Sequence, residues 1–197
     1  MPRLSYISTP ATTAGGRGGQ ASAAVTVFVC ANCTRPAQAP TSAGRKLPAT
    51  PDFGWPWPVR EIVVPCTGRL QPEHILKALE SGADLVCAVA CQEDNCHYLE
   101  GSKRCVRRVD YLRSILQEVG LSRDRLMLVN LPGTAAEDMA LAAGRPARAR
   151  EDLDAQLSAV RDRVIQALKA LPPNPLHRDL SDEAVVVPYQ EDDNDED

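Results

Sequence analysis

An unbroken apolar run within residues 84–90 is the feature that most constrains how this chain folds. A half-buried strand alternates between apolar and polar residues, whereas this run has no polar residue after Asp84. Such a strand is covered on both faces, which is typical of a parallel sheet between two layers of helices. We therefore expect other strands and helices on both sides of it.

The rest of the chain supplies these elements in alternation. Apolar, β-branched runs at residues 25–29, 61–65 and 125–130 indicate three further strands. Helical spacing of apolar residues indicates helices over residues 71–81, 102–119 and 153–171, and Thr134 with Glu137 forms a capping box for a helix ending near Gly144. This alternation predicts an α/β fold, a small doubly wound parallel sheet of about four strands with flanking helices.

The chain of 197 residues is long enough for one domain with a good core. We expect this domain over residues 25–171, interrupted by a proline-rich loop at residues 34–58. Residues 1–24, rich in Gly, Ser, Thr and Ala, are expected to form a flexible N-terminal lead. Residues 172–197 are expected to form an acidic C-terminal tail, disordered or extended.

Composition limits the compartment and the class of partner. No run approaches the roughly 18–20 apolar residues of a membrane span, and the apolar run before Cys30 fits a strand better than a signal peptide. An odd number of cysteines, seven, argues against a disulfide framework, so a reducing cytoplasm is expected. The net charge of −4 argues against a general nucleic-acid binder.

Most of the cysteines follow the predicted strands. Cys30, Cys66 and Cys91 each come directly after a strand, and Cys33 and Cys96 follow closely along the chain. The carboxyl ends of parallel strands form the ligand-binding edge of an open sheet. We therefore expect these five thiols to converge on one crevice.

Soft thiolates gathered in this way select an iron–sulfur cluster or zinc. The cluster is favoured, because structural zinc more typically organises small folds that lack a core. Cys87 lies inside the strand at residues 84–90 and Cys105 lies on a helix, so both are interpreted as buried structural residues. His97, next to Cys96, is interpreted as a packing or hydrogen-bonding group rather than a ligand.

A basic run follows the last of these cysteines. It comprises Lys103, Arg104, Arg107, Arg108 and Arg113. Such a run is either a solvated helix face or a docking surface for an acidic redox partner, and the sequence favours neither.

Several of these segments together resemble a known family. They are Cys-Ala-Asn-Cys at residues 30–33, Cys-Thr-Gly-Arg at 66–69, Gly-Ala-Asp at 82–84 and Cys-Gln-Glu-Asp-Asn-Cys-His-Tyr at 91–98. Over residues 25–129 the chain resembles the delta subunit of methyl-viologen-reducing hydrogenase and related subunits of heterodisulfide reductase-like complexes. The chain departs from that family at Asn32, where an aromatic residue is usual, and in the length of the proline-rich loop.

The resemblance implies one 2Fe–2S cluster and a role in electron transfer. Four of Cys30, Cys33, Cys66, Cys91 and Cys96 would be its ligands, without an indication of which four. The implied partners are a hydrogenase or other dehydrogenase subunit and a flavin- and iron–sulfur-containing heterodisulfide reductase-like subunit.

Two other functions compete with this electron relay. One is a zinc- or thiol-based structural or scaffolding subunit of a multi-subunit complex. The other is a thiol–disulfide enzyme built on Cys30 and Cys33, which is disfavoured because the proline-rich residues after Cys33 predict no helix to lower a thiol pKa. The sequence shows no acid–base pair, phosphate loop or nucleophile–histidine arrangement, so a non-catalytic relay subunit is expected.

Overall fold

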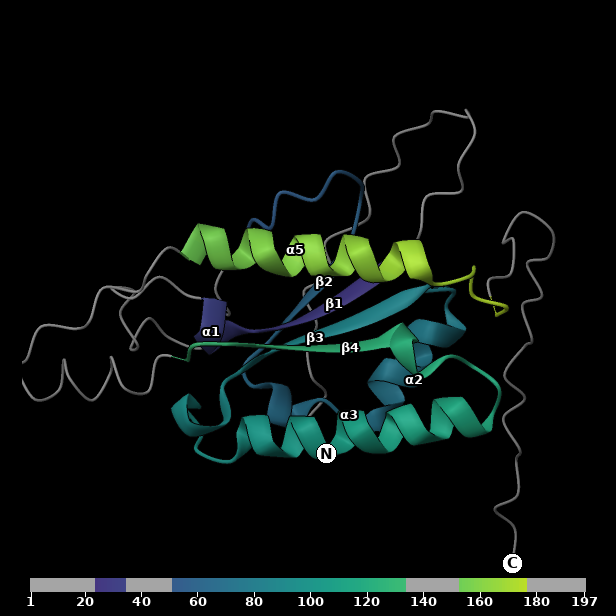
Figure 1. Ribbon diagram of the computed structural model, residues 1–197. Helices are drawn as coiled ribbons and strands as arrows, with labels where there is room; N and C mark the ends of the chain where they lie inside the picture. The colour runs from purple at the N-terminus through teal and green to yellow at the C-terminus, as the bar shows by residue number, and fades with distance from the viewer. Residues whose placement is uncertain (1–23, 35–50, 134–152, 177–197) are drawn as a thin grey trace, which may run out of the picture.

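The computed structural model describes residues 24–34, 51–133 and 153–176, and these form a parallel four-stranded sheet between helices (Figure 1). The strands are β1 (Val25–Cys30), β2 (Arg60–Val64), β3 (Leu85–Cys91) and β4 (Leu126–Leu131). Their order across the sheet is β2-β1-β3-β4, and every neighbouring pair is parallel. The predicted α/β class and the parallel sheet are confirmed.

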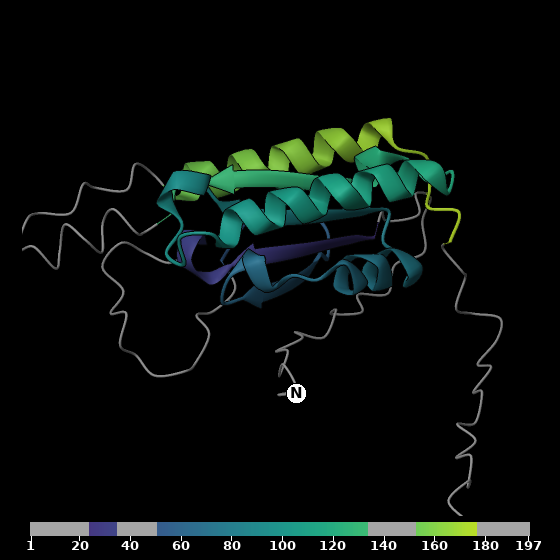
Figure 2. The same ribbon diagram turned by 90° about the horizontal axis from the view of Figure 1, so that it is seen from below.

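Helices cover both faces of this sheet. The helices α2 (Pro72–Glu80) and α3 (Gly101–Glu118) lie on one face, and α5 (Leu153–Ala170) lies on the other (Figures 1 and 2). Short helical segments are α1 (Ala31–Thr34), η1 (Thr67–Arg69), η2 (Glu93–Asn95) and η3 (Arg123–Arg125). None of the helices in the described part of the chain combines the length and apolarity that a membrane crossing requires.

Strand β3 has buried side chains on both of its faces, as its apolar sequence predicts. Val86 and Ala88 belong to the apolar cluster under α2 and α3, whereas Cys87 and Val89 belong to the cluster under α5. Burial raises the pKa of Cys87 to about 12, so this thiol stays neutral. Cys105 is buried in the other cluster, where burial raises its pKa to about 11. Both thiols pack as structural residues, as expected.

A buried arginine ties the end of α5 to the sheet. Arg125 is only 2% exposed, and its guanidinium donates hydrogen bonds to the carbonyl oxygens of Asp84 at 3.0 Å, Pro172 at 2.9 Å and Pro173 at 2.9 Å. A charged donor makes stronger hydrogen bonds to carbonyl groups than a neutral one. Arg125 therefore holds the chain after α5 against the start of β3.

The next residues of the chain are also anchored. Asn174, which the expected division places in the tail, is buried, and its side-chain amide donates to the carbonyl oxygens of Leu79 and Ala83. The backbone N–H groups of Asn174 and Ala24 donate to the two carboxylate oxygens of Asp84. Packing of the domain therefore continues beyond Pro172.

Some expectations differ from the structure or fall outside it. The helical spacing predicts Val119 on the apolar face of its helix, but this residue is 64% exposed because α3 ends at Glu118 and Gly120 follows with φ +79°. The N-terminal lead, the capping box at Thr134 and Glu137, most of the proline-rich loop and residues 177–197 lie outside the described residues. The domain boundaries stay a prediction.

Replacement of Arg125 by methionine is expected to lower the free energy of unfolding by about 2–4 kcal/mol, because three hydrogen bonds from a buried, charged donor are lost. Urea denaturation followed by circular dichroism measures this change. Arg123→Met is the matched control, because Arg123 is exposed and its loss should change stability by less than about 0.5 kcal/mol. Equal midpoints for the two variants would contradict the anchoring role.

Candidate metal centre

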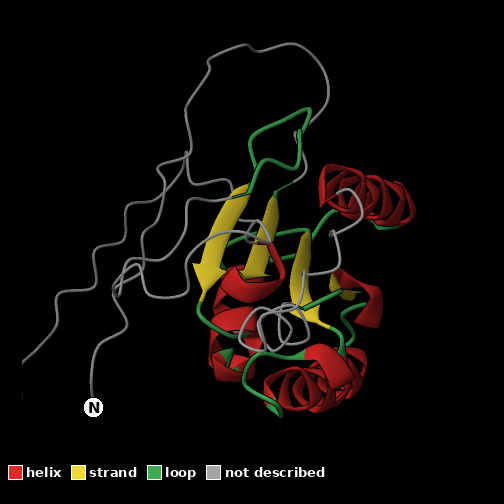
Figure 3. Cartoon of the chain, turned by 90° about the vertical axis from the view of Figure 1, so that its left-hand side faces the viewer, coloured by secondary structure: helices red, strands yellow, loops and turns green. Residues whose placement is uncertain are grey.

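Three thiols meet at the carboxyl edge of the sheet, which Figure 3 views end on. Cys30 ends β1, Cys91 ends the neighbouring β3, and Cys33 follows in α1. All three sulfur atoms lie within 4.8 Å of one another, and those of Cys30 and Cys91 are 3.6 Å apart. The parallel pairing of β1 with β3 therefore brings together thiols that are 61 residues apart in the sequence.

Cys33 lies in a helical turn that the sequence analysis did not predict. The turn α1 directs the Cys33 thiol toward the sheet, where it donates to the carbonyl oxygens of Cys30 at 3.4 Å and Val89 at 3.8 Å. Asn32 donates its side-chain amide to the carbonyl oxygen of Pro65 at 3.0 Å, which ties the Cys-x-x-Cys turn to the end of β2. The helical turn therefore includes Thr34, the first residue of the expected proline-rich loop.

The other two thiols lie against the first residue of α3. Cys66 precedes η1, and its sulfur accepts a hydrogen bond from the N–H of Gly68 at 3.3 Å. A Cβ atom added at Gly101 would overlap the Cys66 sulfur and lie 3.3 Å from the Cys96 sulfur. Gly101 thus allows the backbone to approach these thiols closely, and Gly68, where an added Cβ would collide with the backbone of Gly101, allows η1 to lie against it.

The loop that carries Cys96 is held by contacts that the sequence analysis missed. Asn95 donates its side-chain amide to the carbonyl oxygen of Gly133 at 2.8 Å, and Asn130 donates to that of Cys91 at 2.8 Å. A Cβ atom at Gly133 would collide with the carbonyl oxygen of Asn95. No local pattern marks these residues, because their partners lie 38 and 39 residues away.

All five thiols are buried, with exposures of 5% or less. Hydrogen bonds from Cys33 and Cys91 lower the pKa of Cys30 to about 3, whereas the pKa of Cys33 is raised well above its usual value by donation to Cys30. Burial is the main cause that raises the pKa of Cys66 to about 11. Without a metal, one thiolate at Cys30 is therefore stabilised by neighbouring thiols that keep their protons, and a bound metal would take the place of those protons.

The geometry fits a tetrahedral metal–thiolate centre. Two sulfur ligands of one such metal are about 3.8 Å apart when each metal–sulfur bond is about 2.3 Å, and Cys30 and Cys91 are 3.6 Å apart. Among the described residues, the group able to hold a metal contains only cysteines. His97 is exposed and contacts the ring of Tyr98 edge-on, so it does not point into this group of thiols. A donor set of soft sulfur atoms suits iron–sulfur chemistry or zinc.

The comparisons with known proteins point to one family. The family model described as methyl-viologen-reducing hydrogenase, delta subunit, matches residues 25–145. An iron-sulfur subunit of the F420-non-reducing hydrogenase of Archaeoglobus profundus is 38% identical over 82 residues, which are 42% of this chain and 60% of that protein. The corresponding vhc iron-sulfur subunit of Methanococcus voltae is 36% identical over 100 residues, 51% of this chain and 65% of that protein.

A third relative is a much larger protein. It is a subunit of the Ferredoxin:CoB-CoM heterodisulfide reductase of Methanosarcina mazei, 40% identical over 72 residues, which are 36% of this chain and 9% of that protein. The chain thus spans less than two thirds of these hydrogenase iron-sulfur subunits and a small part of this reductase protein.

Replacement of Gly101 by alanine is expected to lower the iron and acid-labile sulfide content at least threefold, because the added methyl group displaces the Cys66 and Cys96 sulfur atoms. Chemical analysis of protein purified without oxygen measures this content. Gly120→Ala is the matched control: its φ of +79° makes alanine costly, yet the space around it is open and distant from the thiols. An unchanged iron content in Gly101→Ala would show that the close approach of the Gly101 backbone to the Cys66 and Cys96 sulfur atoms is unimportant for metal binding.

Proposed function

Because the chain belongs to the family of the methyl-viologen-reducing hydrogenase delta subunit, we propose that it binds one 2Fe–2S cluster and relays electrons within an oxidoreductase complex. The observation that carries this proposal is the convergence of buried thiols at the carboxyl edge of the sheet. When bound, a cluster of this kind takes up and releases single electrons. The coarser conclusion, an iron–sulfur subunit associated with hydrogenase or heterodisulfide reductase, follows from the family.

The thiols divide into two groups that suit the two irons of such a cluster. Cys66 and Cys96 both lie against Gly101, and we assign them to one iron. Cys30 and Cys91, whose sulfur atoms are 3.6 Å apart, are assigned to the other. Cys33 is then the fifth thiol: its sulfur lies in the same group as those of Cys30 and Cys91, but it also donates to two backbone carbonyl groups. Four thiolates complete the ligand set of a 2Fe–2S cluster.

A fully ligated centre suits electron transfer better than catalysis. Four thiolates on two irons leave no open position for a substrate, in contrast to catalytic metal sites. The surrounding residues of this chain bury the sulfur atoms and donate hydrogen bonds to them, as Gly68 does to Cys66. Such hydrogen bonds and burial tune the reduction potential of a cluster. The chain would therefore act as a non-catalytic relay.

The relatives support two kinds of partner. The matched region is similar to a separate hydrogenase iron-sulfur subunit in one relative and to part of a longer heterodisulfide reductase protein in another. Covalent joining of two modules raises their effective concentration, so it favours modules that work together. We propose a hydrogenase or other dehydrogenase subunit as one partner and a flavin- and cluster-containing heterodisulfide reductase-like subunit as the other. A reducing cytoplasm would keep the thiols available.

The proposal is tested on the full chain purified without oxygen. We expect about two irons and two sulfides per chain, and an electron paramagnetic resonance signal after reduction with dithionite that is typical of one unpaired electron. Metal analysis and the resonance spectrum measure these properties. A colourless protein with one zinc ion per chain would refute the cluster and favour the zinc-based scaffolding function.

The ligand assignment is tested with single substitutions to serine. Cys30→Ser, Cys66→Ser, Cys91→Ser and Cys96→Ser should each lower the iron content more than threefold, whereas Cys33→Ser should retain at least half of it. Cys105→Ala is the control, because this thiol is buried in the opposite apolar cluster. Loss of iron in Cys33→Ser together with its retention in Cys91→Ser would reverse the assignment of these two residues.

A further inference from the structure

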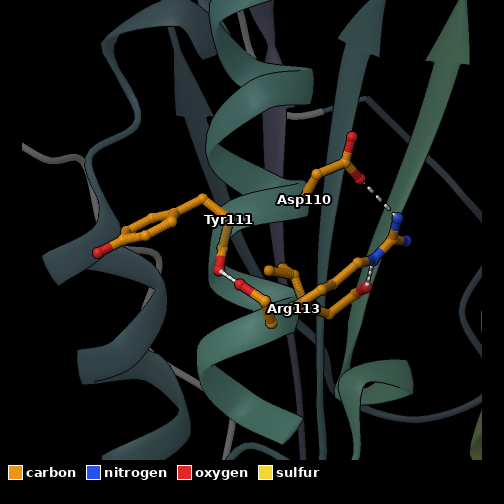
Figure 4. A network of polar contacts seen from close by, with 5 residues as sticks. Asp110, Tyr111 and Arg113 are labelled. Carbon is orange, nitrogen blue, oxygen red and sulfur yellow. Dashed lines mark hydrogen bonds and ion pairs between the residues drawn. The ribbon is translucent and has the colours of Figure 1, made fainter. Parts of the chain in front are cut away.

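The basic run on α3 divides into two sets in the structure. Arg108 faces inward and donates to the carbonyl oxygens of Gly68 at 2.6 Å and Leu70 at 3.0 Å. Arg113 donates to the carbonyl oxygen of Leu126 and pairs with Asp110, as Figure 4 shows. These two arginines therefore brace α3 against its neighbours, and they are not part of an open surface.

The remaining basic residues face outward. Arg104 and Arg107 are exposed and Lys103 is partly exposed, while Tyr111 is 61% exposed and projects from α3 away from Arg113 (Figure 4). Spacings of three and four residues place these side chains on one side of the helix. The whole chain has a net charge of −4, so this local positive charge opposes the overall balance.

Two exposed apolar residues extend this surface toward the thiols. Tyr98 is 54% exposed and Leu99 is 78% exposed, and Leu99 has φ +57°. A leucine is unfavourable in this left-handed conformation, where Gly or Asn is usual. The fold holds Leu99 there through the hydrogen bond from its N–H to the carbonyl oxygen of Cys96 at 2.9 Å. Leu99 is thus an exposed apolar side chain in an unfavourable backbone conformation. This combination points to a function other than stabilising the fold.

This surface lies next to the Cys66 and Cys96 pair. We define the α3 face as Tyr98, Leu99, Lys103, Arg104, Arg107 and Tyr111. It begins two residues after Cys96. The buried Gly101, which lies between Leu99 and Lys103 in the sequence, is the residue against which the Cys66 and Cys96 sulfur atoms lie. A protein bound to the α3 face would thus contact the chain at the backbone that covers these thiols.

We infer that the α3 face is the docking surface for an acidic protein that exchanges electrons with the thiol-bound centre, with Leu99 as an apolar contact. Arginine and tyrosine are enriched in protein interfaces and carry much of their binding energy. Opposite charge around such a contact steers the encounter and fixes its orientation. Nucleic-acid binding depends on many contacts between cations and phosphates, whereas the α3 face has few cations and an exposed leucine on an acidic chain. A protein is therefore favoured as the partner over a nucleic acid. This inference rests on the proposed function.

The experiment uses the full chain and two electron-accepting proteins of opposite charge as probes, an acidic plastocyanin and a basic cytochrome c. The affinity for each is measured by fluorescence anisotropy, and the oxidation of the reduced chain is followed by stopped flow. The double variant Arg104→Glu/Arg107→Glu should weaken binding of the acidic probe, and slow its electron transfer, about tenfold at low salt. The basic probe should bind more tightly, and added salt should reduce both effects.

Arg123→Glu is the matched control, because Arg123 is exposed in η3, at the opposite edge of the sheet. It should change either affinity less than twofold. Equal effects of the two charge reversals would overturn the α3 face as the docking surface. Tighter binding of a single-stranded RNA oligonucleotide than of the acidic probe would overturn the choice of a protein partner.

The apolar contact is tested with Leu99→Asn, because asparagine accepts the left-handed conformation and removes the apolar side chain. The thermal unfolding midpoint should stay the same or rise. A fall of more than about 5 °C would mean that Leu99 serves the folded chain itself and would overturn its role in docking.

Two outcomes distinguish this inference from the proposed function, and a third distinguishes it from binding of the chain's own residues 191–197 to the α3 face. The affinity can be measured on a chain that holds no iron–sulfur cluster. If a chain loaded with zinc binds the probes in a charge-dependent way, the docking surface stands and the iron–sulfur relay is refuted. A chain that holds the iron–sulfur cluster, but whose binding and electron-transfer rates do not depend on charge, would keep the relay and overturn the docking surface. A chain ending at Leu176 that binds the acidic probe tenfold more tightly would assign the α3 face to the acidic residues 191–197 and overturn the inference.

Discussion

The parallel pairing of β1 with β3 is the constraint on which the thiol site depends. Its register places Val29 opposite Val89, so the two strands end beside each other at Cys30 and Cys91. Because one residue along a strand is about 3.3 Å, a slip of this register would change the distance between the two sulfur atoms. Both faces of β3 are packed, with Val86 in the apolar cluster under one helical layer and Val89 in the cluster under the other.

The position of a residue could be predicted from the sequence where it depends on a local pattern. It could not be predicted where it depends on contacts with residues far away in the chain. The apolar run of β3 and the cysteines at the strand ends follow from periodicity and from the rule that parallel strands end at one edge. Asn174 gave no such signal, because its partners are the carbonyl groups of Leu79 and Ala83, more than 90 residues away. The exposure of Val119 depended on where α3 ends, and helix ends are the least certain part of a pattern.

The scaffold has an extensive apolar core of its own. Apolar clusters fill both faces of the sheet, with Leu112 and Ile75 on one side and Val160 and Val164 on the other. Small zinc domains gain their folding free energy from the metal, whereas this sheet gains it from the burial of apolar surface. The thiols can therefore be held in place before any metal arrives, which lowers the entropic cost of binding one.

The hydrogen bonds of Asp84 bring the two ends of the domain to one place. Its carboxylate accepts from the N–H of Ala24, before β1, and from the N–H of Asn174, after α5. Both ends of the domain are therefore at the amino edge of the sheet, opposite the thiols. A module built in this way can be inserted into a longer polypeptide, or released from one, without altering the edge of the sheet that carries the thiols.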